Sequence, residues 1–442
     1  MGQRSPFRSF NAEHFVPNES WHRLERILDE NGGCYGLYGP RGSGKSWLML
    51  MAIHRAMDRG GLGLWFPCPS EYESETFLAM LADSLAVRVQ RDYPRRGRTR
   101  RLAKAATKLR ERIRFSVRMK HGTDVEVGGS RGSATASLRR SGERELDERP
   151  VNIASWVFEF RYLSELITAT TGHGLVIGID ELDKIDDPKA FARLLRDIKG
   201  IFEIQNVTFL VSVSEEAASA LKTGTLRAGG RDEFNSSFNT VIELPPLDPA
   251  ETARLLTSRN IGISEYRAHL LCLLAAGNAR EIIRLAERTQ GLADDNEVLI
   301  ATMKDEAEGL LGKLITGTSE EQSLVTAWRL LPASAFATTE AFAELSAHAI
   351  HDWEQHDEAW RRLLVRLFVA GRVIKSECAA ADLCDVMGMA ARNATVARIM
   401  LRERFGPDLD RPYRKLPLIT GPLPTYHHFI PVRRHLHAVT RP

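Results

Sequence analysis

The sequence predicts an α/β fold in which a parallel, doubly wound sheet precedes a mainly helical C-terminal half. Short apolar runs alternate with amphipathic segments of helical periodicity, and this order is typical of a parallel sheet covered by helices on both faces. The apolar runs are residues 34–39, 61–70, 173–185, 206–217 and 239–247. From residue 248 onward apolar residues recur mostly at helical spacing, which predicts helices there.

The composition is that of a globular chain. Its 442 residues are 43% hydrophobic and 26% charged, which indicates about two to four folded domains. No apolar run is long enough to span a bilayer, and the first residues lack the apolar core of a secretion signal. None of the 5 cysteines has C-x-x-C spacing, so neither a zinc site nor a disulfide framework is predicted. We therefore expect a reducing, cytoplasmic setting.

The most specific motif is the loop between the first apolar run and the first long helix. Its eight residues are Gly39, Pro40, Arg41, Gly42, Ser43, Gly44, Lys45 and Ser46, and they fit G-x-x-x-x-G-K-[ST] throughout. In this pattern glycines turn backbone N–H groups toward the phosphates of a nucleotide, and the following helix contributes its positive end. Lys45 is expected to reach the β- and γ-phosphates, and the Ser46 hydroxyl to hold Mg²⁺.

Two acids end the strand predicted over residues 173–185. Asp180 is expected to anchor the Mg²⁺ site, and Glu181 to polarise the attacking water in nucleotide hydrolysis. The alternative is a solvated acidic turn after a core strand. The next strand carries Ser212 and Ser214 on one face, where either could sense the γ-phosphate or serve as an ordinary strand serine.

These residues resemble those of the AAA+ and related P-loop ATPases, over about residues 12–290. The segment HFVPNESWHRLERIL is similar to the AAA+ segment that touches adenine, which implies nucleotide contacts for Phe15 and, directly after the loop, Trp47. GNAREIIRLAER resembles the lid helix of replication initiators, which implies that Arg280 reaches the nucleotide. The resemblance also implies a trans-acting arginine finger, for which Arg231 is the first candidate and an ordinary loop arginine the alternative.

A second resemblance is to the KAP group of P-loop NTPases. It lies in IDELDKIDD and in the presence of an insertion between the phosphate loop and the acidic strand. The KAP insertion spans the membrane in some members, whereas this one is basic and polar. Together the two resemblances imply a P-loop NTPase sheet with a helical lid, ATP and Mg²⁺ as cofactors, and oligomerisation.

The predicted organisation has five parts. The ATPase core covers residues 1–90 and 145–247 and is interrupted by a basic helix and hairpin insertion over 91–144. A helical lid follows over 248–315, then a helical or winged-helix domain over 316–405 and an extended tail over 406–442. In the insertion, alternating apolar residues at 115, 117 and 119 predict an exposed hairpin.

Charge is concentrated in the insertion. Residues 91–140 hold 16 Lys and Arg against 4 Asp and Glu, a net charge of +12 in a chain whose net charge is +3. Such a run indicates a phosphate backbone as partner, whereas a solvated helix, contact with an anionic membrane and docking on an acidic neighbouring subunit stay open as alternatives. Its aromatic residues are few, so base stacking on this run is not expected.

The leading hypothesis is a Mg²⁺-dependent ATPase acting as a switch or motor, on DNA or in a DNA-linked or anti-phage defence complex. A second hypothesis is an ATP-gated binding module that oligomerises and hydrolyses slowly or not at all. A third is a defence-type signalling ATPase that oligomerises on a trigger.

Overall fold

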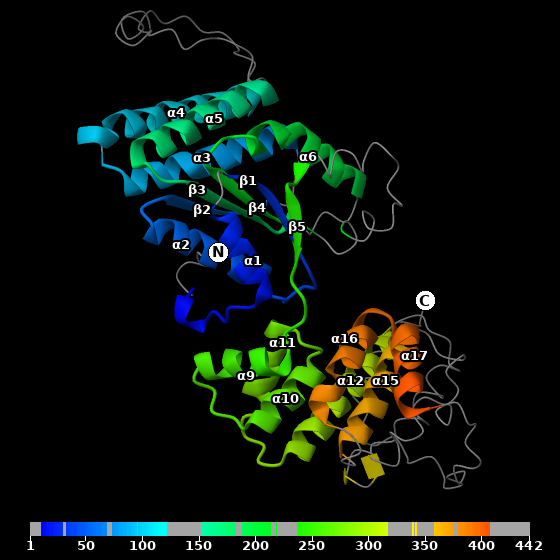
Figure 1. Cartoon of the computed structure of the whole chain (residues 1–442). Helices are drawn as coiled ribbons and strands as arrows, with labels where there is room; N and C mark the ends of the chain where they lie inside the picture. The colour runs from blue at the N-terminus through cyan, green and yellow to red at the C-terminus, as the bar shows by residue number, and fades with distance from the viewer. Residues whose placement is uncertain are drawn as a thin grey trace, which may run out of the picture. The chain divides into compact units, whose positions relative to one another are not determined.

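The computed structural model describes most of the chain and divides it into two compact units (Figure 1). The described residues are 10–29, 32–68, 73–94, 96–121, 152–182, 188–213, 218, 237–316, 338–339, 341–342, 358–374 and 379–406. The first unit holds the described residues up to Val298 together with Ala380–Gly388. The second holds those of Leu299–Ala379 and from Met389 onward.

The first unit is built on a parallel sheet, as predicted. Its strands are β1 (Gly33–Tyr38), β2 (Leu62–Pro67), β3 (Leu175–Asp180), β4 (Val207–Val213) and β5 (Thr240–Glu243). Within the described residues they form one sheet in the order β2-β3-β4-β1-β5, and every neighbouring pair is parallel. Leu37 lies opposite Ser212, and Ile179 lies opposite Val211, so β1, β4 and β3 end at the same edge.

Both faces of the sheet are covered, which explains why its strands read as continuous apolar runs. All residues of β3 and of β4 are buried. Alternate side chains enter two cores. Ile177 and Phe209 belong to the core on one face, and Val176 and Leu210 to the core on the other.

Helices α1 (Glu19–Ile27) and α2 (Lys45–Asp58) cover one face, and α3 (Ser74–Asp92), α5 (Ile153–Thr171) and α6 (Pro188–Phe202) cover the opposite one (Figure 1). On the α1 and α2 side, Trp21 and Leu24 pack with Met49 and Ile53. Asn18 caps α1 by accepting a 3.0 Å hydrogen bond from the Trp21 N–H. The Ser20 hydroxyl, two residues later, instead donates to the Glu243 carbonyl at 2.8 Å and ties α1 to β5.

The helical part of the predicted insertion belongs to this second layer. After the short η3 turn (Gly97–Thr99), α4 (Arg100–His121) buries Leu102, Ala106, Leu109 and Ile113 and contacts α3 and α5. The hairpin predicted from the alternation at residues 115, 117 and 119 is wrong, because these residues continue α4. Apolar residues recurring at three- and four-residue spacing from Leu102 onward keep the chain helical. The remainder of the insertion lies outside the described residues.

The lid predicted over residues 248–315 spans α9 (Pro249–Ser258), α10 (Glu265–Leu274), α11 (Ala279–Arg288) and all but the last residue of α12 (Asp295–Thr316), and the term lid is kept below for the first three helices. Short η2 (Ala12–His14) precedes the core, and η7 (Ala380–Leu383) returns to the first unit. The division between the units falls within α12 and again within α16 (Cys384–Arg392).

The described part of the second unit is helical, including α15 (Glu358–Ile374) and α17 (Ala394–Phe405). The segments that would distinguish a winged helix, and almost all of the predicted tail, lie outside the described residues. Among the residues that are described, no helix is long and apolar enough to cross a membrane.

Candidate functional site

The predicted phosphate loop joins β1 to α2 at the edge where the strands end. Its glycines adopt backbone angles that L residues rarely reach, with φ of 154° at Gly39, 90° at Gly42 and 104° at Gly44. The Ser43 N–H donates to the Pro40 carbonyl at 3.1 Å and closes a tight turn. Glycine adopts such positive φ angles without strain, so the three glycines allow the loop to turn tightly after β1.

The start of α2 has the properties of an anion site. Gly44 is its N-cap residue, and no side chain caps the first turn that contains Lys45 and Ser46. Helix N-termini carry unpaired N–H groups and a partial positive charge, which phosphates satisfy. Among the described residues, the Ser43 hydroxyl oxygen is buried and has no hydrogen-bond partner. Both observations fit a loop that holds phosphate oxygens.

The Lys45 side chain rests on its own loop. Its Nζ donates to the Gly39 carbonyl at 2.7 Å and to the Pro40 carbonyl at 3.3 Å, and the residue is 7% exposed. Carbonyl oxygens are neutral acceptors, whereas a phosphate oxygen carries charge and forms a stronger hydrogen bond. A bound phosphate would therefore draw this ammonium group away from the carbonyls.

Asp180 ends β3 at the same edge of the sheet and is 5% exposed. Its Oδ1 accepts the Glu181 N–H at 2.9 Å, and its Oδ2 accepts the Trp65 indole N–H at 3.4 Å. The carboxylate is thus held in one orientation by a strand neighbour and by its own successor. Carboxylate and hydroxyl oxygens are the ligands that Mg²⁺ takes, so Asp180 and Ser46 fit the cation predicted for this edge.

The residue after Asp180 has an unusual backbone. Glu181 is not glycine, yet its φ is 66°, a conformation that costs free energy for most residues. The next N–H, that of Leu182, donates to the Ser212 hydroxyl at 3.0 Å, and Ser212 is fully buried in β4. Ser212 therefore supports the turn that presents Glu181, a role that its place in a strand did not indicate.

The lid contacts the phosphate loop directly. Nδ2 of Asn278, the N-cap residue of α11, donates to the Arg41 carbonyl at 2.7 Å. The Arg280 N–H donates to the Gly42 carbonyl at 3.2 Å, and the Arg280 side chain is exposed. The backbone of Arg280 thus lies beside the loop, while the role of its side chain stays a prediction. Asn278 was missed by the sequence reasoning, although an Asn that directly precedes a helical segment is a common capping signal.

Aromatic side chains gather at the first turn of α2. The Phe10 ring lies 5.0 Å from the Trp47 ring, and the Arg259 guanidinium lies over Trp47 at 5.2 Å. Burial lowers the pKa of Arg259, and the Glu287 carboxylate opposes that shift. The Arg259 Nε is buried without a hydrogen-bond partner in the described part of the chain. Phe15, the other predicted contact, instead packs edge-on against Trp21 at 5.2 Å.

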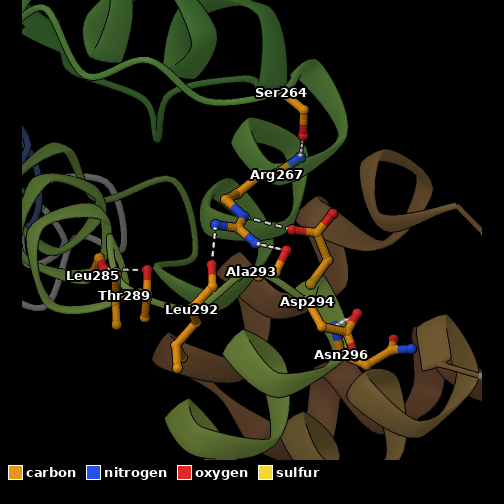
Figure 2. Close-up of polar contacts among 9 residues, drawn as sticks. Ser264, Arg267, Leu285, Thr289, Leu292, Ala293, Asp294 and Asn296 are labelled. Atoms are coloured by element: carbon orange, nitrogen blue, oxygen red, sulfur yellow. Dashed lines mark hydrogen bonds and ion pairs between the residues drawn. The ribbon is translucent and has the colours of Figure 1, made fainter.

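A second polar cluster joins the lid to the next helix. Figure 2 shows the Arg267 guanidinium of α10 donating to the carbonyls of Leu292 at 2.7 Å and Ala293 at 3.0 Å. Its Nε donates to Asp295 Oδ1 at 2.5 Å, at the first residue of α12. One side chain therefore fixes α10 to the loop and helix that lead out of the lid.

Two predicted site residues, Ser214 and Arg231, lie outside the described residues. Two cavities of about 300 Å³ each lie elsewhere, at the opposite edge where the strands begin. They are lined by residues such as His173 and Asn206 in one and Lys199 and Phe238 in the other. Neither includes a residue of the phosphate loop, so the chemistry indicated by Lys45 and Asp180 is not theirs.

Comparison with known proteins gives only distant likenesses. No protein-family model matches the chain, and no curated protein matches it. Among solved structures, AMPPCP-bound DnaA from Aquifex aeolicus is 13% identical, with a TM-score of 0.37, and covers 89% of this chain and 98% of its own.

Two further structures are as distant. A point variant of RuvB from Thermotoga maritima is 13% identical, with a TM-score of 0.34, and the match covers 86% of this chain and 89% of that one. The Aeropyrum pernix ORC1 protein in complex with DNA is 14% identical, with a TM-score of 0.33, and the match covers 87% and 81%. Similarity at this level carries no argument, and the α/β fold rests on this chain's own strands and helices.

Proposed function

We propose that the chain is a Mg²⁺-dependent ATPase of AAA+ type that works as a nucleotide-driven switch. The observation that carries the proposal is the pair of hydrogen bonds from Asn278 and Arg280 of the lid to Arg41 and Gly42 of the loop. Phosphates held by this loop would displace or tighten these contacts, so the lid would respond to the nucleotide. A bound ATP·Mg²⁺ would supply the phosphoryl group and the divalent charge.

Each predicted residue has a role in this proposal. Loop N–H groups and Lys45 hold phosphate oxygens, while Ser46 and Asp180 hold the cation. Glu181 orients and deprotonates the attacking water, and the strained turn anchored on Ser212 fixes its direction. Arg280 places positive charge near the terminal phosphate. Ser214 as a phosphate sensor and Arg231 as a finger for a neighbouring subunit remain part of the proposal.

The base would lie near Trp47. The Arg259 guanidinium lies over one face of the Trp47 ring. The Nε–H of the same side chain is a buried donor that lacks an acceptor among the described residues. Purine rings stack on aromatic side chains and offer nitrogen acceptors. Because Phe15 packs on Trp21, we assign the first contact with the base to Trp47, and Phe15 supports the segment behind it.

The catalytic assignment is tested by Glu181→Gln and Lys45→Ala. Glu181→Gln should retain ATP affinity while turnover falls about 100-fold or more, because general-base catalysis contributes that much. Lys45→Ala should lose affinity. Glu203→Gln, an exposed acid beyond α6, is the matched control and should match wild type.

The measurements are ATP turnover and equilibrium binding, with and without double-stranded DNA, alongside solution mass with ATP. Unchanged turnover in Glu181→Gln would show that another group activates the water. If wild type binds ATP but never hydrolyses it, the ATP-gated binding module replaces the ATPase.

The partner surface that we favour is a basic ridge on η3 and α4. Its exposed side chains are Arg96, Arg98, Arg100, Arg101, Lys104, Lys108 and Arg114. The neighbouring Arg110 and Arg112 are engaged inward, with Asp83 and with Glu159. These exposed cations outnumber the one exposed acid among residues 96–114, Glu111, and such an excess favours a polyanion, so we propose a nucleic-acid backbone as the occupant.

Helix α5, which contacts α4, carries two exposed aromatic side chains. Arg112 of α4 pairs with Glu159, and the adjacent Phe158 is 67% exposed, while Tyr162 one turn later is 40% exposed. Two solvated rings on the helix that packs against α4 would supply the stacking surface that the insertion alone lacks. This combination favours single-stranded over double-stranded nucleic acid.

The ridge is tested by the double variant Lys104→Glu, Lys108→Glu against Arg193→Glu, Arg196→Glu on α6. Both change the charge equally, and the control residues are exposed. Only the ridge variant should weaken binding of a labelled oligonucleotide and reduce the salt slope by about 2, since each lost phosphate contact removes nearly one. Phe158→Ala should weaken single-stranded binding alone. Unchanged DNA binding with a smaller solution mass would assign the ridge to a subunit contact.

A further inference from the structure

Two cysteines far apart in the sequence meet in the first unit. Cys272 is near the end of α10, and Cys384 is the first residue of α16. Their sulfur atoms lie 3.8 Å apart, and the Cys384 thiol donates to the Cys272 sulfur. Cys34 and Cys68 are also buried.

The two thiols differ in access. Cys272 is fully buried, with its sulfur 3.3 Å from the Leu247 carbonyl oxygen, whereas Cys384 is half-buried and lies 3.4 Å from the Ala380 carbonyl oxygen. The hydrogen bond from Cys384 lowers the pKa of Cys272, and burial opposes that shift. The same hydrogen bond and burial raise the pKa of Cys384, and the carboxylates of Asp385 and Asp248 add to that rise.

The pair is linked to the phosphate loop through backbone hydrogen bonds. The Gly277 N–H donates to the Cys272 carbonyl at 2.9 Å, and the Leu247 N–H donates to the Gly277 carbonyl at 2.8 Å. A Cβ on Gly277 would lie 2.6 Å from the Pro246 Cβ, so this turn is closely packed. Asn278, which holds the Arg41 carbonyl, follows directly. A displacement of α10 at Cys272 would therefore be passed through Gly277 and Asn278 to the phosphate loop.

We propose that Cys272 and Cys384 form a reversible disulfide site for oxidation by a peroxide. One thiolate sulfur attacks a peroxide oxygen, the O–O bond breaks, hydroxide leaves, and a sulfenic acid forms. The second sulfur attacks that sulfur, the S–O bond breaks, and water leaves with the second thiol's proton. In sum, two thiols lose two electrons and two protons, and the peroxide is reduced to two waters.

The disulfide would fasten the lid to the segment that begins α16. Bond formation requires the sulfurs to close from 3.8 Å to about 2.05 Å, which moves α10 against the turn at Gly277. A nucleotide on the loop would hold that turn in place. We therefore expect ATP·Mg²⁺ to slow oxidation about fivefold or more, the lower range of coupling between sites. This second effect rests on the proposed ATP site, whereas disulfide formation does not.

The test treats the full chain with hydrogen peroxide and maps the peptides by mass spectrometry. Oxidation should consume two of the 5 thiols, yield a peptide that links Cys272 to Cys384, and reverse with dithiothreitol. Cys384→Ser and Cys272→Ser should each abolish the link, and the half-buried Cys384 is the safer of the two for folding. Cys378→Ser is the matched control and should leave the link intact.

The outcomes separate the claims. A link that needs Cys378, or no link in folded protein, overturns the proposal. If the link forms and ATP·Mg²⁺ slows it in wild type but not in Lys45→Ala, both the site and its coupling are supported. If ATP binds and the rate is unchanged, the coupling is wrong. If ATP does not bind at all, the proposed function fails while the disulfide site stands.

Discussion

At the scale of single residues, the loop sequence predicts its own shape but not its neighbours. The motif requires glycines at Gly39 and Gly44, and both adopt positive φ. It leaves the residue at position 42 unspecified, yet Gly42 also has positive φ, and its missing side chain leaves room for the lid. A Cβ there would lie 2.5 Å from Asn278 Oδ1 and 3.0 Å from the Arg280 Cβ. Asn278 lies 236 residues after Gly42 in the chain, so no local sequence pattern indicates this contact.

Gly42→Ala and Gly44→Ala form a matched pair. Each places an L residue at positive φ, which costs about 1–2 kcal/mol of unfolding free energy. A Cβ on Gly44 meets nothing within 4 Å, whereas one on Gly42 strikes the start of α11. We expect Gly42→Ala to be the less stable by about 1–3 kcal/mol, because the lid must shift. Urea unfolding without nucleotide measures the difference. Equal stability of the two variants would show that the lid does not rest on the loop.

At the scale of elements, helix α4 shows a local sequence pattern that predicts the wrong secondary structure. The residues at 115–119 alternate like a strand, but a helix that is already anchored by Leu102, Ala106, Leu109 and Ile113 extends through them. Tertiary packing overrides a short local pattern. Lid helix α10 is predicted by its periodicity, but the contacts that hold its two ends are not visible in the sequence pattern. Arg267 holds it to α12, and Cys272 meets Cys384.

Arg267→Met tests the connection between α10 and α12. Arg267 is mostly buried and makes three polar contacts, so its loss leaves two carbonyls and the Asp295 carboxylate without this donor. We expect a loss of about 1–3 kcal/mol, because the pair is only partly buried, with the Asp295 side chain 27% exposed. Arg284→Met removes an exposed pair with Glu281 and should cost about 0.5 kcal/mol or less. Chemical denaturation compares them, and similar losses in both would mean that the Arg267 cluster is not a structural clamp.

At the scale of the whole molecule, the chain forms two compact units, and every described residue assigned to the nucleotide site belongs to the first. The unit boundary falls inside α12 rather than in a linker, and the chain returns to the first unit at Ala380–Gly388. The returning segment carries Cys384 and thereby adds a second attachment to α10.

This organisation predicts two unfolding transitions, of which ATP·Mg²⁺ raises one. A ligand at one hundred times its Kd stabilises the unit that binds it by about 2.7 kcal/mol and leaves an independent unit unchanged. Lys45→Ala should abolish the shift without altering the other transition. Differential scanning calorimetry measures both. A single transition that moves as a whole would mean that the two units unfold together.

The sequence by itself determined the α/β class, the five strands of the described sheet, the glycines of the loop after β1 and the two acids at and after the end of β3. These follow from apolar periodicity, glycine spacing and residues adjacent in the chain, which are local properties. Tertiary structure decided what touches the loop and what holds the lid. Asn278 on Arg41, Ser212 beneath the turn of Glu181 and Cys272 beside Cys384 each join segments that are at least 30 residues apart. Such contacts arise from packing of the folded chain, and no local pattern encodes them.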